Sequence, residues 1–194
     1  MAPQRLSIKL FFTQDQLPEA NEQIAMFHRW IRDKKLNGLL IDVADYAHVP
    51  EGPGIMLIGH EADYAIDRGS GGPGLMVTRK RIDAGDLTAA VKQTCRLALA
   101  AAEALADESL SAPMEVATDR MRVLVLDRLQ YPSEGGDLQG WVEQIGAAVS
   151  KVAGSQAVAE PVPDDGRGPV TVDLKITEAI SLQELSQRAA AAAS

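Results

Sequence analysis

The sequence predicts an α+β protein in which helices cover one face of a sheet and one structural plan occurs twice. Segments with apolar residues at every second position, such as 6–12, are typical of strands with one buried face. They alternate with segments whose apolar residues have helical spacing. Each half has a strand, a helix, a strand, a Gly-x-Gly turn, a strand and a helix, so that Ile8 corresponds to Val123 and Gly38 to Gly154.

The first half begins with a strand over 6–12, followed by a helix that has Pro18 in its first turn and ends near Asn37-Gly38. The next segment, GLLIDVADY, is continuously apolar at its start, which favours a strand in the interior of the sheet. Asp86 is expected to cap a long helix over 87–106. Further strands are predicted in GIMLIG, ADYAID and LMVTRKRI.

The second half repeats this order with clearer end signals. RVLVLDR predicts a strand, and Asp137 caps a helix that stops at Gly154. Residues 157–162 are typical of an edge strand, because Pro161 has no N–H to donate to a neighbour. VTVDLKI follows as a strand, and Ser181 with Glu184 forms the capping box of a last helix.

These elements predict two βαββα units of the ferredoxin-like kind, 1–110 and 111–194, in one compact body with an antiparallel or mixed sheet. One larger mixed sheet covered by helices is the alternative. The turn at 166–168 has two candidate counterparts in the first half, 52–54 and 72–74. If the later one is correct, the first unit has an added hairpin over about 55–74, with HEADY at its tip.

Composition limits the classes of partner. Twenty-seven acidic residues against nineteen basic ones give a net charge of −8, which argues against nucleic acid, and the run Arg79-Lys80-Arg81 is most simply a solvated strand end. No apolar stretch is long enough for a membrane span, and no signal peptide is recognisable. The single cysteine, Cys95, excludes an intrachain disulfide. We therefore expect a cytoplasmic protein.

The segment around HEADY contains the candidate chemistry. His60 is suited to general acid/base catalysis because an imidazole titrates near neutral pH, and a carboxylate orients it. Glu61 points to the opposite face of a strand from its neighbour, so Asp63 or Asp45 is the better orienting group. The catalytic candidates are therefore His60, Glu61 and Asp63.

A metal site is the less favoured hypothesis for the same segment. His48, His60 and Asp63 offer suitable ligands for a divalent ion, but their spacing fits no zinc pattern. If 39–45 and 55–60 pair as antiparallel strands, the two histidines lie at opposite ends and do not need to meet. A histidine that only hydrogen-bonds the turn is the simpler interpretation.

Two functional hypotheses follow. The first is a cytosolic ligand-binding, protein-binding or assembly module, expected to form a homo-oligomer, whose turn region 45–67 contacts a small molecule or a protein. Its contact residues would be Asp45, Tyr46, His48 and Tyr64. The second is an enzyme that uses His60 with Asp63 or Glu61 as acid and base or as metal ligands. No cofactor is predicted, and a divalent metal belongs only to the second hypothesis.

Overall fold

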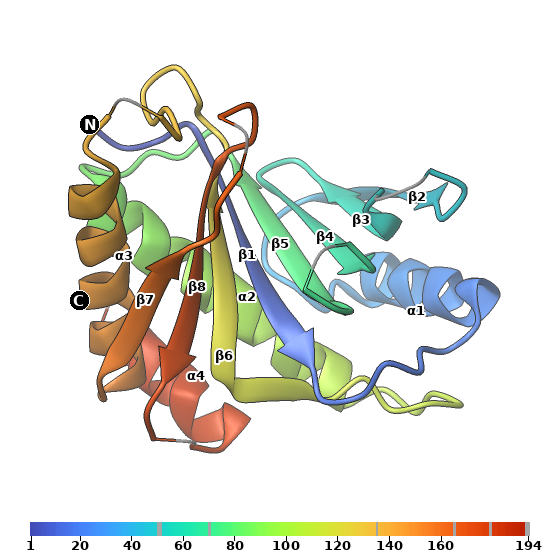
Figure 1. Cartoon of the computed structure of the whole chain (residues 1–194). Coiled ribbons are helices and arrows are strands. Elements are labelled where there is room, and N and C mark those ends of the chain that lie inside the picture. The colour runs from blue at the N-terminus through green and yellow to red at the C-terminus, as the bar shows by residue number, and fades with distance from the viewer. Residues whose placement is uncertain (50–51, 70, 135, 165, 179, 193–194) are drawn as a thin grey trace.

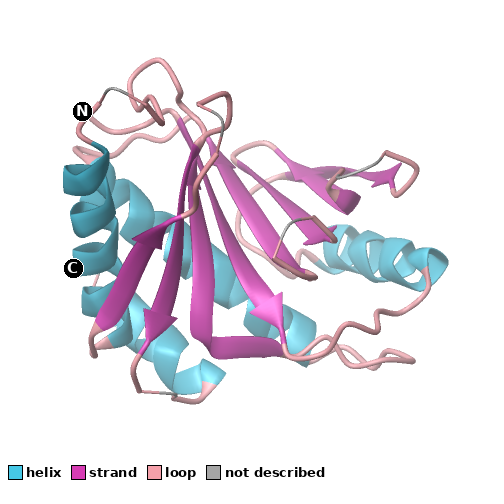
Figure 2. Cartoon of the chain, in the orientation of Figure 1, coloured by secondary structure: helices cyan, strands magenta, loops and turns pink. Residues whose placement is uncertain are grey.

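The computed structural model describes residues 1–49, 52–69, 71–134, 136–164, 166–178 and 180–192, and within them it has four helices and one eight-stranded sheet. The strand order is β2-β3-β4-β5-β1-β6-β8-β7, and every neighbouring pair is antiparallel. The helices cover one face of this sheet (Figures 1 and 2). The α+β prediction is confirmed, and the single larger sheet of the alternative is also observed, although its strands are antiparallel and not mixed.

Every strand segment expected from the sequence is present, although the strand predicted at RVLVLDR, 122–128, spans 116–125 instead. Their bounds are β1 Arg5–Phe12, β2 Leu40–Tyr46, β3 Gly54–Gly59, β4 Ala62–Asp67, β5 Gly74–Lys80, β6 Val116–Val125, β7 Ala157–Pro161 and β8 Val170–Ile176. The central neighbours β1 and β6 come from different halves of the chain. Both halves therefore belong to one continuous sheet.

The four helices are α1 Ala20–Asp33, α2 Leu87–Ala106, α3 Leu138–Ala153 and α4 Leu182–Ala191. The last three begin where their caps predict, whereas α1 begins without a side-chain cap, and Pro18 precedes it instead of lying in its first turn as predicted. The Asp86 carboxylate accepts from the Ala89 N–H, and Asp137 and Ser181 cap α3 and α4 in the same way. Among the described residues, no helix is both long and apolar enough to cross a membrane.

The first helix ends earlier than the predicted Asn37-Gly38. Lys34 adopts a left-handed conformation with φ of 50°, and its N–H bonds to the Ile31 carbonyl. The next N–H, of Lys35, bonds to the Trp30 carbonyl. These bonds satisfy the last carbonyls of the helix, so the chain leaves the helical path after Asp33 without a glycine.

One hydrophobic core fills the space between the sheet and the helices. On β1, Leu6, Ile8 and Leu10 face the helices and are completely or almost completely buried. The register places Ile8 beside Val77 on β5 and Val123 on β6, so that the apolar face continues across the sheet. This face fixes the register, because a shift by one residue would move every apolar side chain to the other side.

The prediction that GLLIDVADY lies inside the sheet is wrong. β2 is an edge strand that pairs only with β3, and Leu39 and Ile41 are 65% and 54% exposed. The hairpin formed by β3 and β4 lies between β2 and β5, which moves β2 to the edge. β7 is the opposite edge, as Pro161 predicted.

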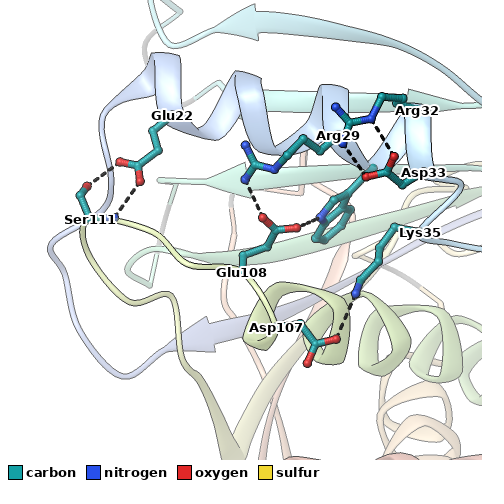
Figure 3. Close-up of polar contacts among 9 residues, drawn as sticks. Glu22, Arg29, Arg32, Asp33, Lys35, Asp107, Glu108 and Ser111 are labelled. Atoms are coloured by element: carbon teal, nitrogen blue, oxygen red, sulfur yellow. Dashed lines mark hydrogen bonds and ion pairs between the residues drawn. The ribbon is translucent and has the colours of Figure 1, made fainter.

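Polar contacts join α1 to the segment that follows α2 (Figure 3). Glu108 accepts from Arg29 Nη2 at 2.6 Å and from the buried Trp30 Nε1 at 2.8 Å. The neighbouring Asp107 pairs with Lys35 at 3.0 Å, but this contact is solvent-exposed. Glu108 therefore forms an ion pair with Arg29 and also accepts the hydrogen bond of the buried Trp30 indole N–H.

We expect Glu108→Ala to lower the free energy of unfolding by about 1–3 kcal/mol, because it leaves the Trp30 N–H buried without its acceptor. Asp107→Ala is the matched control and should cost less than about 1 kcal/mol, since its carboxylate is 72% exposed. Urea denaturation measures both. Equal losses in the two variants would contradict this role of Glu108.

Candidate functional site

A row of charged residues crosses the middle of the sheet on the face opposite the helices, which we call the open face. Strand register places Lys9 beside Arg122, Arg122 beside Asp173, and Asp173 beside Glu160. These residues come from β1, β6, β8 and β7, respectively. Charged side chains are rare in the middle of a sheet unless they are paired or functional, so this row defines the candidate site.

The most buried pair in this site is Lys9 and Asp67. Their side chains are only 2% and 6% exposed, and the Lys9 ammonium donates to Asp67 and to the Gly69 carbonyl. Gly74 makes room for this contact, because a Cβ there would lie 3.1 Å from two Lys9 side-chain carbons and 2.5 Å from the Leu10 carbonyl oxygen. A larger residue at position 74 would clash with the backbone of β1 and would also require the Lys9 side chain to shift.

Three cations surround the aromatic ring of Phe11. Lys9 Nζ, Arg120 Cζ and Arg122 Cζ lie 5.4, 5.2 and 5.6 Å from the ring centroid. This is the range in which a cation is attracted to the π-face of an aromatic ring. Gly71, with φ of 88°, brings the β4–β5 loop onto the same ring, since a Cβ at this position would lie 3.0 Å from Phe11 Cε1. The ring is therefore held from several sides.

The Arg122 guanidinium makes a two-pronged ion pair with Asp173. Nε and Nη2 donate to the two carboxylate oxygens at 2.6 and 2.9 Å. These hydrogen bonds raise the pKa of Arg122 above its usual value, against the opposing effect of partial burial. The planar fork fixes the orientation of both side chains, which makes this part of the site rigid.

These residues border a pocket of about 510 Å³ on the open face. Its charged lining residues are three acids and three bases: Asp119, Glu160, Asp173, Arg120, Arg122 and Lys175. Arg120 donates to the Phe12 carbonyl at 3.2 Å, and within the described part of the chain it has no carboxylate at ion-pair distance. Its guanidinium is therefore available to a ligand.

The two histidines of the predicted turn region lie at opposite ends of β3. His48 is in the connection from β2, whereas His60 follows the last residue of β3. The antiparallel pairing of β2 with β3 confirms the strand arrangement on which that separation was predicted. His60 is exposed, and its Nε2 lies 3.4 Å from Arg81 Nη1.

The carboxylates near these histidines have other partners. Asp63 accepts from Lys80 Nζ at 2.7 Å and from the Gly59 N–H at 3.2 Å. Asp45 accepts from the Ala47 N–H at 2.8 Å within its own turn. Asp63 is thus held by a lysine and a backbone N–H, and in the described chain no hydrogen bond joins it to His60.

The two tyrosines predicted to bind ligand lie in different environments. Tyr46 is exposed at the end of β2. Tyr64 is buried in the core, and burial together with the charges of Glu61 and Asp63 raises its pKa to about 12. Residues 50–51 of the predicted contact region 45–67 lie outside the described residues. The structure therefore divides this region between the core and the solvent-exposed surface.

Among the residues that the structure describes, no three His, Cys, Asp or Glu side chains are grouped as a metal site requires. This includes His48, His60 and Asp63 as they are placed here. The roles of His60, Glu61 and Asp63 in catalysis, and of the turn region in binding, stay predictions.

The open-face residues were not identified as a site from the sequence. One signal was present in the sequence. Lys9, Asp173 and Lys175 interrupt otherwise apolar strands at positions on the open face. Alternation shows that such residues face away from the core, but it does not show which strands are neighbours. The pocket depends on the order β1-β6-β8-β7, which brings residues from opposite ends of the chain, such as Phe11 and Glu160, into one lining.

Comparisons with known proteins add no assignment: no protein-family model and no curated protein matches this chain. Function must therefore be argued from the geometry.

We expect Asp67→Ala to destabilise the protein by about 3–5 kcal/mol, because it removes the carboxylate from a buried ammonium. The double substitution Lys9→Met with Asp67→Leu removes both charges and should recover most of that loss. Chemical denaturation of the single and double variants measures the difference. A double variant as unstable as Asp67→Ala would show that packing, and not charge burial, dominates.

Proposed function

We propose that this protein is a small-molecule-binding module and that its ligand occupies the open-face pocket. The observation that carries this proposal is the pocket itself, a hollow of about 510 Å³ whose walls combine an aromatic ring, an apolar side chain and balanced charges. Its size is in the range of pockets that hold small molecules, about 300–1,000 Å³. Its polar groups stand on strands, which hold them more rigidly than loops would.

The lining suggests the chemistry of the ligand. Arg120 and Lys175 offer donors to an anionic group, and Glu160 and Asp119 offer acceptors to a cationic one. Val158, which is 43% exposed, provides a small apolar surface beside them. Because acids and bases are equal in number, the site favours a ligand that carries both charges. We propose a zwitterion of amino-acid type.

The test is a thermal-shift screen of amino acids and related zwitterions, followed by calorimetric titration of any ligand found. Arg120→Gln should weaken binding about tenfold or more, because it removes a charged hydrogen-bond donor. Arg128→Gln makes the same chemical change at a position outside the pocket, and should leave affinity unchanged. Binding that Arg120→Gln does not alter would place the ligand elsewhere.

We further propose that the two halves are related by duplication of a ferredoxin-like unit. The strand order supports this: β1-β5-β4 in the first half and β6-β8-β7 in the second extend outward from the central pair β1 and β6. In both halves the first strand is followed by a helix, two adjacent antiparallel strands and a helix, if β2 and β3 are counted as an insertion. This insertion differs from the hairpin over about 55–74 that the sequence predicted, which corresponds to β3 and β4. With that insertion, the boundary near residue 110 separates the two units.

We propose that the chain self-associates through β2, which agrees with the expected homo-oligomer. The outer edge of this strand pairs with no other strand of the described chain, and Leu39, Ile41, Tyr46 and Val49 are exposed beside it. An apolar edge of this kind is usually protected or paired in native proteins. A second copy would supply the same apolar residues and bury both sets.

Sedimentation equilibrium over a range of concentrations tests this proposal. Ile41→Lys should raise the dissociation constant at least about tenfold, because it introduces a charge where apolar area is buried. Leu129→Lys is the control, since Leu129 is 98% exposed in the connection after β6. A monomeric wild-type chain at all concentrations would contradict the proposed interface.

We also propose a cytoplasmic location. It is supported by Cys95, a thiol that is buried and forms no disulfide, with its pKa raised to about 12 by burial.

A further inference from the structure

A second hollow lies at the other end of β1 from the pocket, and its charged lining is entirely basic. We call this hollow the basic groove. It has a volume of about 560 Å³ and is lined by Gln4, Arg5, Lys80, Arg81 and Ile82. Three of these five residues are cationic in a chain whose net charge is −8. Such segregation of positive charge in an acidic protein is the electrostatic requirement for an anion site.

Strand register forces two of these cations together. Arg5 and Lys80 are directly opposite each other on β1 and β5, an arrangement in which like charges repel. Lys80 is partly compensated, because its Nζ donates to Asp63 Oδ1 and to the Gly59 carbonyl, both at 2.7 Å. Arg5 and Arg81 have no carboxylate at ion-pair distance among the described residues. Two guanidinium groups of the groove therefore lack an anionic partner within the described chain.

The backbone of Arg81 is unusual and brings its side chain toward His60. Its φ of 53° lies in the left-handed region, which is unfavourable for a residue with a Cβ. From there, Nη1 reaches within 3.4 Å of His60 Nε2. A guanidinium can only donate, so a hydrogen bond in this contact requires His60 Nε2 as the acceptor. The imidazole thus borders the groove, and its resonances report on what binds beside Arg81.

We propose that the basic groove binds a single phosphate group through Arg5, Lys80 and Arg81. The fork of a guanidinium matches two oxygens of a tetrahedral oxyanion, and Lys80 adds a point charge that Asp63 holds in position. The acids Glu61 and Asp63 close to the groove, together with the net charge of −8, oppose a long polyanion. The site therefore suits free phosphate or a small phosphorylated molecule, and it is independent of the ligand proposed for the open-face pocket.

The experiment is an NMR titration of inorganic phosphate into the full chain with isotopically labelled histidine, at constant pH and ionic strength. The chain has three histidines, and the His60 signal is assigned by its loss in His60→Gln. We expect a saturable shift of the His60 signal, with the signals of His28 and His48 unchanged. Equal, non-saturating shifts of all three signals would overturn the proposal.

Variants locate the phosphate. Arg81→Gln and Arg5→Gln should each weaken binding about five- to tenfold, because each removes one charged donor group. Arg5 is exposed, so its variant tests the site even if the substitution at the left-handed position of Arg81 disturbs folding. Lys34→Gln removes one charge at the exposed end of α1 and should bind phosphate as the wild type does. Equal affinity in Arg5→Gln and Lys34→Gln would overturn the proposal.

The same titration distinguishes a small phosphate ligand from a nucleic acid. A short single-stranded oligonucleotide should shift the His60 signal no more strongly than inorganic phosphate does at the same concentration of phosphate groups. If the oligonucleotide instead binds about a hundredfold tighter than phosphate, the small-ligand assignment is rejected in favour of a nucleic-acid surface, since a polyanion gains affinity from many phosphate contacts.

Discussion

The antiparallel pairing of β1 with β6 is the constraint on which the rest of the structure depends. It joins the two halves of the chain into one sheet, and its register acts on both faces at once. On the helix side it places Ile8 against Val123 in the core. On the open face the same register places Lys9 beside Arg122 and therefore sets the charged row of the pocket. Core and site cannot be changed independently.

The buried Lys9–Asp67 pair extends this constraint to the hairpin of the first half. Asp67 is the last residue of β4, so the ion pair ties the end of that strand and the loop after it to β1, across β5. Burying two charges is unfavourable unless they meet, so the pair holds the end of β4 in place against β1. Gly71 then lies against Phe11, which completes one wall of the pocket.

Local features of the fold were predictable from the sequence, and non-local ones were not. The cap of α2 at Asp86 and the stop of α3 at Gly154 depend on a few neighbouring residues, and both were predicted at the observed positions. β2 is at the edge because β3 and β4 lie between it and β5, and no periodicity in LIDVADY can reveal this order. An apolar run in the sequence looks the same whether its strand is central or lies at the edge of the sheet.

The same distinction explains why the sequence pointed to HEADY and not to the pocket. His60, Glu61 and Asp63 are neighbours in the chain, so they stand out together as a cluster. The pocket draws Phe11, Arg120 and Asp173 from three strands, and each is unremarkable alone.

The two ends of β1 also differ in how the charged side chains around them are paired. At the Phe11 end, the cations lie around an aromatic ring, and Asp173 and Asp67 pair with two of them, so that the site is rigid and electrically balanced before any ligand enters. At the Arg5 end, β1 and β5 bring Arg5 and Lys80 side by side, and of these two only Lys80 has a carboxylate at ion-pair distance within the described chain. An unbalanced cluster of this kind gains most from an added anion, because each new contact also relieves repulsion. The same strand therefore connects the pocket proposed for a zwitterion with the groove proposed for an anion.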